Sequence, residues 1–138
     1  IDESPKKVNS TDAMNLLNDF PELKKLWIDS TKDAFEDMKE AIIANDFDMI
    51  GQIAESHASL MHYIIQETGV RYLTDLSFKV IDLTEKLRAE GYPVYATMDA
   101  GANVKILTKK AYVDQVINRY KKLSKVIVSY SGLGVTSV

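Results

Sequence analysis

The sequence has no cysteine, only three prolines and no long apolar run, and these absences exclude several classes of protein. Without cysteine there is no disulfide framework and no thiolate chemistry. No apolar run approaches the roughly 18 residues that cross a bilayer, so we expect no membrane span. The first residues lack the apolar segment of a secretory signal peptide, and we therefore expect none. These features agree with a cytoplasmic protein.

The charge of the chain is mixed and gives no support to a nucleic-acid partner. The 138 residues include 17 basic and 20 acidic side chains, for a formal net charge of −3. Because no basic stripe with interleaved aromatic residues is present, nucleic-acid binding is not expected. Hydrophobic residues make up 46% of the chain, which suffices for one core, so residues 1–138 are predicted to form a single domain.

Familiar motifs for nucleotide and metal binding are also missing. The chain has no G-x-x-x-x-G-K-[ST] loop, and Gly132-Leu-Gly134 is too short to cradle a phosphate. His57 and His62 are five residues apart, so they do not share a helix face as an i, i+4 metal pair would. We therefore expect no metal site and little affinity for ATP in this chain alone.

Apolar spacing predicts several helices before residue 90. Residues 10–12 supply N-cap candidates for a short helix. Amphipathic stripes then predict long helices over residues 21–45 and 47–65, whose short connection favours an antiparallel hairpin. A third amphipathic helix is predicted over residues 75–89, with Gly91 just after its end in the position that favours glycine.

Two short strands joined by a tight loop are predicted next. Residues 94–98 and 104–107 alternate in the manner typical of half-buried strands. The loop between them, residues 99–103, begins with aspartate and ends with asparagine, both of which can bond to loop amides. Gly101 is free to adopt a positive φ there. The local pattern predicts a β-hairpin.

The last third of the chain is predicted to add a helix and further extended segments. The helix, over residues 110–122, should bury four side chains, Ala111, Val113, Ile117 and Tyr120. Residues 126–128 form a short apolar β run, and a turn leads to a final segment at residues 135–138. Helices followed by a hairpin, a helix and a strand predict an α+β domain with helices on one face of an antiparallel sheet.

The hairpin carries the most specific sequence signal. Thr97-Met-Asp-Ala-Gly-Ala-Asn-Val-Lys105 is similar to the T-M-D-A-G-P-N-V-K motif of mevalonate diphosphate decarboxylases, members of the GHMP kinase superfamily. The preceding Glu90-Gly-Tyr-Pro-Val-Tyr95 resembles their A-G-Y-P-C-Y. Met61-His62, and the run from Lys6 to Met14, fall where the family has M-H and K-K-V-P-S-R-x-G-M. The resemblance covers most of the chain.

The resemblance implies a fold and a function. It implies the C-terminal part of such an enzyme, without the N-terminal ATP-binding domain, and a ferredoxin-like fold whose first strand is largely missing. The implied reaction is ATP- and Mg²⁺-dependent phosphorylation of the 3-hydroxyl of mevalonate diphosphate. Loss of phosphate and carbon dioxide then gives isopentenyl diphosphate for isoprenoid biosynthesis. A homodimer, and partnership with the chain's own N-terminal domain, are implied as well.

Asp99 is the candidate catalytic residue. On spacing alone, an aspartate here more often initiates a turn. The resemblance instead implies that it faces the substrate hydroxyl, where a carboxylate can accept the hydrogen bond and hold the oxygen in line with the γ-phosphate. The resemblance also implies substrate contacts and loop-shaping roles for a few further residues: Ser10, Met14 and Ala100 for the substrate, Gly101 and Asn103 for the loop. From the local pattern, Ser10 is rather a helix N-cap.

Two departures from the family pattern lie on its substrate side. Thr11 stands where the family has an arginine that reaches the diphosphate, and threonine cannot supply a bidentate cationic fork. Residues 66–72 replace a Pro-Pro-aromatic stretch, and Arg71 within them is a candidate to compensate for Thr11. Ala102 replaces the proline of the loop motif, which changes the rigidity of the loop while Asp99 keeps its place.

These departures leave alternatives open. The chemistry could be that of a decarboxylase acting on a mevalonate mono- or bisphosphate, or of a mevalonate-type kinase that does not decarboxylate. A non-enzymatic alternative is a free-standing ferredoxin-like binding or regulatory module.

Overall fold

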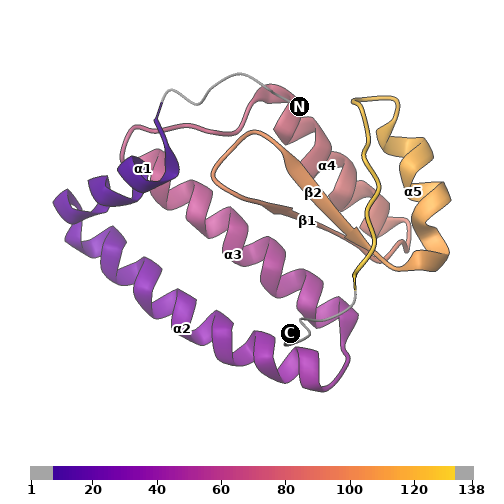
Figure 1. Ribbon diagram of the computed structural model, residues 1–138, viewed down its shortest axis with the longest axis horizontal. Coiled ribbons are helices and arrows are strands. Elements are labelled where there is room, and N and C mark those ends of the chain that lie inside the picture. The colour runs from indigo at the N-terminus through magenta and orange to yellow at the C-terminus, as the bar shows by residue number, and fades with distance from the viewer. Residues whose placement is uncertain (1–7, 133–138) are drawn as a thin grey trace, which may run out of the picture.

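The computed structural model describes residues 8–132 of the chain. These residues contain five α-helices and one two-stranded antiparallel sheet (Figure 1). The α+β class is therefore confirmed. Short 3-10 turns, Leu17–Asp19 and Lys110–Tyr112, precede two of the helices. The elements in chain order are α1 (Ser10–Leu16), α2 (Pro21–Ile43), α3 (Phe47–Glu67), α4 (Asp75–Ala89), β1 (Val94–Met98), β2 (Val104–Thr108) and α5 (Val113–Tyr120).

The two longest helices, α2 and α3, lie side by side in opposite directions, as the sequence predicted (Figure 1). Asn45 reverses the chain between them with a positive φ of 54°, a conformation that asparagine tolerates better than most residues. The Asp46 side chain then caps α3 by accepting hydrogen bonds from the amides of Asp48 and Met49. The connection is thus built from local turn and capping chemistry.

Helix α4 begins and ends at the predicted residues because both of its ends carry strong signals. Thr74 and Ser77 form a reciprocal capping box at its start. After its end, Gly91 adopts a φ of +93°, which favours glycine, and its amide bonds to the carbonyl of Arg88. The chain then passes directly into β1, so these signals also fix where the hairpin starts.

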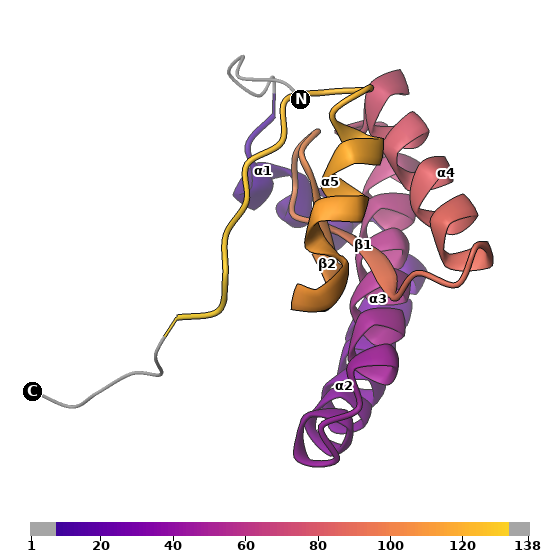
Figure 2. The same cartoon turned by 90° about the vertical axis from the view of Figure 1, so that its right-hand side faces the viewer.

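Strands β1 and β2 pair in the predicted hairpin, with Tyr95 opposite Leu107 and Thr97 opposite Lys105. The prediction of a half-buried β1 is wrong, because Tyr95 is only 4% exposed, and Val94 and Ala96 on either side of it are buried as well. Helices α3 and α4 both contact β1, and Figure 2 shows them together on one side of the hairpin.

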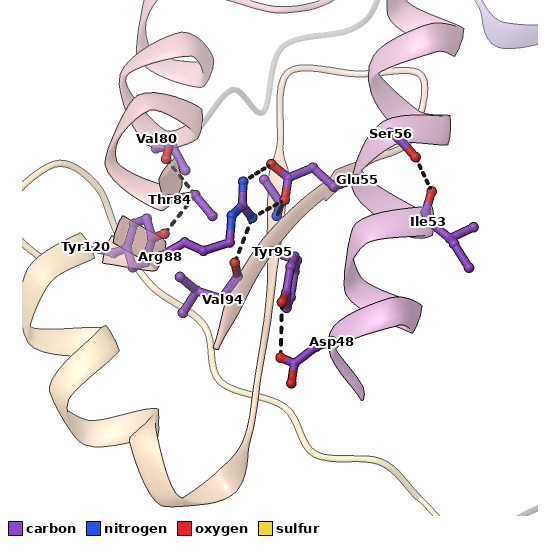
Figure 3. Close-up of polar contacts among 11 residues, drawn as sticks. Asp48, Ile53, Glu55, Ser56, Val80, Thr84, Arg88, Val94, Tyr95 and Tyr120 are labelled. Carbon is purple, nitrogen blue, oxygen red and sulfur yellow. Dashed lines mark hydrogen bonds and ion pairs between the residues drawn. The ribbon is translucent and has the colours of Figure 1, made fainter. Parts of the chain in front are cut away.

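Close packing between α3 and β1 depends on a glycine. Gly51 lies directly against the ring of Tyr95, and a Cβ atom placed on Gly51 would come within 2.0 Å of a ring carbon. The Tyr95 ring is held from other sides as well, since its hydroxyl donates to Asp48 at 3.0 Å and Arg88 lies over its face at 5.0 Å from the centroid (Figure 3). The absence of a side chain at Gly51 sets the distance between helix and strand.

An ion pair joins α3, α4 and β1 (Figure 3). The two Nη atoms of Arg88 donate to the two carboxylate oxygens of Glu55 at 2.6 and 3.0 Å, and both side chains are largely shielded from solvent. Arg88 also donates to the carbonyl of Val94, and Glu55 accepts from the amide of Ala96 at 3.3 Å. The pair therefore satisfies backbone groups of β1 that do not bond to β2.

Three local predictions are wrong. The N-cap of α1 is Asn9, whose side chain accepts from the amide of Asp12, so the predicted N-cap candidates at residues 10–12 lie inside the helix. In α5, Val116 is buried while Ala111, which precedes the helix, is exposed. Residues 126–128 do not form a strand, and Ile127 is 82% exposed. The segments predicted within residues 1–7 and 133–138 lie outside the described residues.

Candidate functional site

An open pocket of about 530 Å³ lies between the hairpin tip and helices α1, α2 and α3. Figures 1 and 2 both show the loop between β1 and β2 close to α1. The pocket brings together side chains that are far apart in the sequence, from four elements and one loop. Its lining residues are Ser10, Trp27, Ala54, His57, Ala58, Met61, Thr97, Met98, Asp99 and Ala100.

Asp99 lies immediately after β1 at the solvent-facing side of this pocket, and its side chain is 81% exposed. Lys105 of β2 forms an ion pair with Asp99 through Oδ2. Lys105 is opposite Thr97 in the strand register, and Thr97 also lines the pocket. The hairpin thus places a carboxylate and a paired cation beside a threonine hydroxyl at one edge of the pocket.

The loop that carries Asp99 is held by two helices. The buried His62 of α3 donates from Nε2 to the Asp99 carbonyl at 3.0 Å, and the Gly101 amide donates to the same carbonyl at 2.7 Å. From α4, the Ser77 hydroxyl donates to the Ala102 carbonyl at 2.7 Å. Hydrogen bonds therefore hold the loop backbone near both of its ends. The Asp99 side chain is largely exposed to solvent and can still rotate.

Gly101 shapes the loop in a different way from that predicted. Positive φ angles in the described part of the chain occur at Asn45, Gly69 and Gly91, so Gly101 does not use the left-handed region. Its contribution is the short hydrogen bond from its amide to the Asp99 carbonyl. Asn103, the other predicted loop-shaping residue, lies exposed at the end of the loop just before β2.

Ser10 reaches the pocket because α1 is attached to the connection after α3. The Tyr72 hydroxyl lies 3.1 Å from the carbonyls of both Val8 and Asn9, the two residues before α1. The rings of Tyr72 and His62 meet edge to face, with centroids 6.3 Å apart. His62 and Tyr72 thus link the Asp99 loop to α1, a relation that the sequence did not reveal because 37 residues separate His62 from Asp99.

Only some of the predicted substrate-binding residues line the pocket. Asp99, Ser10 and Ala100 meet in the pocket, but Met14 and Thr11 are not among the described residues that line it. Met14 is half-buried in α1, and Thr11 is exposed one residue after Ser10. Arg71 is not among the described lining residues either, and it donates to the Leu73 carbonyl, so its compensating role for Thr11 stays a prediction.

The opposite wall of the pocket carries a cluster that sequence reasoning missed. The rings of Trp27 and His57 lie 4.6 Å apart at an interplanar angle of 31°. Thr31 Oγ1 is 3.1 Å from His57 Nε2, and the Thr31 hydroxyl donates to the Trp27 carbonyl at 2.7 Å. Trp27 and Thr31 belong to the apolar stripe predicted for α2, and His57 lies on the facing helix α3, so the sequence pattern gave no sign of a pocket wall.

Burial lowers the pKa of both histidines near the site. For His62 the shift from the ordinary value of 6.5 is opposed by the hydrogen bond to the Asp99 carbonyl, and for His57 burial is the cause. Unfolded histidines therefore bind protons at pH values where the folded ones do not. The contribution of His57 and His62 to the free energy of unfolding is therefore present above their pKa in the unfolded chain. It is lost as the pH falls towards their lower pKa in the folded protein.

Substitution His62→Gln should weaken this pH dependence. Glutamine can still donate to the Asp99 carbonyl but does not titrate, so the free energy of unfolding should fall less between about pH 7.5 and about pH 5.5. Urea unfolding at both pH values measures the effect. His57→Gln is the matched control. It should remove only the part of the pH dependence that comes from His57 and leave the part that comes from His62. An unchanged pH dependence in His62→Gln would contradict the assignment.

The described residues show neither a metal cluster nor a membrane-spanning helix. Between residues 8 and 132, no group of three or more histidine, aspartate or glutamate side chains is placed to hold a metal ion. Over the same range, every helix is too short or too polar to cross a bilayer.

The fold and the pocket together define an α+β domain in which a carboxylate lies beside an open pocket, on a hairpin loop that two helices hold in place. The family model described as the mevalonate 5-diphosphate decarboxylase C-terminal domain matches residues 1–131. The chain belongs to this family, and the resemblance read from the hairpin motif is confirmed.

Two relatives of this chain are named as decarboxylases of phosphorylated mevalonates. It is 33% identical over 97 residues to diphosphomevalonate decarboxylase from Debaryomyces hansenii, covering 67% of this chain and 25% of the relative. It is 36% identical over 85 residues to phosphomevalonate decarboxylase from Haloferax volcanii, covering 59% and 26%. The chain spans about a quarter of the length of these relatives.

A solved structure agrees with the fold. Mevalonate diphosphate decarboxylase from Enterococcus faecalis, solved with MVAPP, AMPPCP and magnesium, superposes with a TM-score of 0.82 at 30% identity. The match covers 91% of this chain and 39% of that one. An ATP analogue and magnesium thus accompany the substrate in a member of this family.

Proposed function

We propose that the complete protein containing this chain is an ATP-dependent mevalonate diphosphate decarboxylase, and that this domain supplies its substrate-binding half. The observation that carries the proposal is the position of Asp99 on a loop held by two helices, beside a pocket that Ser10 and Ala100 also line. The product would be isopentenyl diphosphate, a precursor in isoprenoid biosynthesis.

In this proposal Asp99 acts on the 3-hydroxyl of the mevalonate unit. Lys105 contacts Oδ2 of the carboxylate, so Oδ1 is the oxygen available to accept the hydroxyl hydrogen bond and then the proton. ATP, when bound, supplies the phosphoryl group that makes the 3-oxygen a leaving group. Phosphate then departs with the C–O bonding pair, carbon dioxide departs from the substrate carboxylate, and the released C–C bonding pair forms the alkene.

Other residues are assigned to substrate binding or to loop shape. We assign Ser10 and Ala100 to direct substrate contact, since both line the pocket. Met14 of α1 is half-buried and is assigned to the same substrate contact by the family resemblance alone. Gly101 and Asn103 keep the loop in shape. ATP and Mg²⁺ are assigned to an N-terminal domain, because the sequence has no phosphate loop and residues 8–132 hold no metal cluster. A cytoplasmic homodimer belongs to the same proposal.

A second candidate is a decarboxylase acting on mevalonate 5-phosphate. Thr11 favours it, because a neutral side chain replaces the arginine that would meet the second phosphate. The 36% identity to the Haloferax volcanii phosphomevalonate decarboxylase is in line with this candidate. Both candidates share the role of Asp99 and differ only at the phosphate end of the substrate.

The deciding experiment uses the complete protein encoded by the gene, with ATP and Mg²⁺. Mevalonate, its 5-phosphate, its 5-diphosphate and its 3,5-bisphosphate are offered separately, and ADP and carbon dioxide are recorded independently. Equal amounts of both products from the diphosphate support the leading proposal, and equal amounts from the monophosphate support the second. ADP without carbon dioxide would indicate a kinase. Neither product from any substrate would leave only a binding module.

Substitution Thr11→Arg should shift the substrate preference towards the diphosphate. The guanidinium gains a charge-assisted contact with the terminal phosphate, so the ratio of kcat/KM for diphosphate to that for monophosphate should rise by about tenfold. Steady-state kinetics with both substrates measures the ratio. Thr11→Gln, long but neutral, is the control and should leave it unchanged. An unaltered ratio in Thr11→Arg would show that position 11 does not reach the phosphate.

A further inference from the structure

The pocket has only two titratable side chains among its described lining residues, and they stand on opposite walls. Asp99 belongs to the hairpin, whereas His57 belongs to α3. No lysine or arginine is among these lining residues. Phosphorylated substrates are anions, so a pocket that binds them needs positive charge or several hydrogen-bond donors. His57 is the one lining side chain that can become a cation.

The surroundings of His57 fix its tautomer. Since the Thr31 hydroxyl donates to the Trp27 carbonyl at 2.7 Å, its oxygen faces His57 as an acceptor at 3.1 Å. Nε2 of His57 therefore carries a hydrogen and donates to Thr31. In the neutral ring the second nitrogen, Nδ1, is then an acceptor, and it donates only after the ring takes up a proton.

Among the described residues that line the pocket or bond to His57, the only charged side chain is that of Asp99. Helix α2 contributes Trp27 and Thr31, which are uncharged, and α1 contributes the hydroxyl of Ser10. The hairpin contributes Asp99, whose carboxylate is paired with Lys105. Burial lowers the pKa of His57, so the ring is neutral near pH 7 while the pocket holds no anion. A phosphate dianion beside Nδ1 favours the protonated ring.

We propose that His57, oriented by Trp27 and Thr31, is the specificity-determining residue that binds the phosphate end of the substrate through Nδ1–H, with uptake of one proton from solvent. This inference rests on the proposed function, and it supplies the positive charge that Thr11 lacks. A single imidazolium contacts one phosphate group, so the inference is tested with the phosphate monoester, the substrate of the second candidate. It also predicts that affinity falls as the pH rises, because the binding proton becomes scarce.

The test compares the complete protein with its His57→Asn variant, whose amide cannot carry a charge. With mevalonate 5-phosphate, KM should rise by about tenfold, as expected for loss of one hydrogen bond between charged groups. kcat should change by less than about threefold, because the reacting atoms are at Asp99. In the unaltered protein KM should rise with pH above about 7, and in His57→Asn that dependence should disappear.

Calorimetry supplies a readout that a purely structural role would not change. Titration of mevalonate 5-phosphate in two buffers of different ionisation enthalpy should reveal proton uptake by the unaltered protein and none by His57→Asn. Thr31→Val, which removes the acceptor that orients the ring together with its hydrogen bond to the Trp27 carbonyl, should raise KM by a smaller factor. Ser59→Ala, on another side of α3 beside a second cavity, is the matched control and should change nothing.

Each outcome is informative. Equal KM values and equal proton uptake in the unaltered protein and His57→Asn would overturn the inference while leaving the decarboxylase proposal intact. An equal loss of affinity for unphosphorylated mevalonate would also overturn it, since His57 would then contact the substrate carboxylate. Absence of turnover in the unaltered protein with every substrate would instead reject the proposed function itself.

Discussion

Asp99→Asn in the complete protein should lower kcat by roughly two to four orders of magnitude while KM changes little. Asparagine has the same shape and can still contact the substrate hydroxyl, but it cannot accept the proton as the O–P bond forms. The side chain is 81% exposed, so its replacement should not unfold the domain. Steady-state assays of ADP and carbon dioxide measure the loss.

The comparison needs a control for general effects of removing a negative charge. Asp114→Asn changes an exposed aspartate in the first turn of α5, away from the pocket-lining residues, and should keep normal turnover. Circular dichroism of both variants checks that they are folded. Near-normal turnover in Asp99→Asn would transfer the catalytic role to another group. A parallel rise in KM would indicate that Asp99 mainly binds the substrate.

Gly51→Ala should destabilise the protein, although alanine is the better helix former. The new methyl group would overlap the Tyr95 ring, since a Cβ atom at position 51 would lie 2.0 Å from the nearest ring carbon. Tyr95 is 4% exposed as a residue, and its side chain is held by Asp48 and Arg88, so the ring has little room to move. Overpacking costs about 1–3 kcal/mol, against a helix-propensity gain of about 1 kcal/mol. Urea unfolding should show a net loss.

A double-mutant cycle tests the cause of that loss. In a Tyr95→Leu background, which removes the clashing ring, Gly51→Ala should become neutral or stabilising, so the two changes should be strongly non-additive. Ser59→Ala, exposed on the same helix, serves as the control for alanine in α3. Additive effects would show that the contact between α3 and β1 tolerates a methyl group.

Displacement of α3 in Gly51→Ala would also move His62, and with it the Asp99 loop.

Local signals in the sequence were enough to predict much of this fold. Both ends of α4 are set by nearby residues, the capping box at Thr74 and the glycine at position 91, and the helix was predicted to its terminal residues. The hairpin and the α2–α3 pair follow from periodicity and turn residues in the same way. Such features depend on contacts within a few residues, which a sequence pattern reports directly.

The N-cap of α1 was misplaced by one residue, but the larger failures of prediction concern contacts between distant segments. Tyr95 occupies the polar phase of an alternating strand, but it is buried because Gly51, far away in the sequence, leaves room for it. Residues 126–128 have a β pattern, yet a pattern does not supply a partner strand. In the site, Asp99 was identified by its motif, whereas Trp27 and His57 were hidden within an ordinary helix-packing stripe.

The ion pair of Glu55 and Arg88 determines at which edge a further strand can join the sheet. Its two side chains bond to the Ala96 amide and the Val94 carbonyl, the backbone groups through which another strand would attach to β1. An approaching strand would have to displace a partly buried salt bridge at this edge, which protects β1 from pairing with foreign chains. Any strand that extends this sheet must therefore add alongside β2.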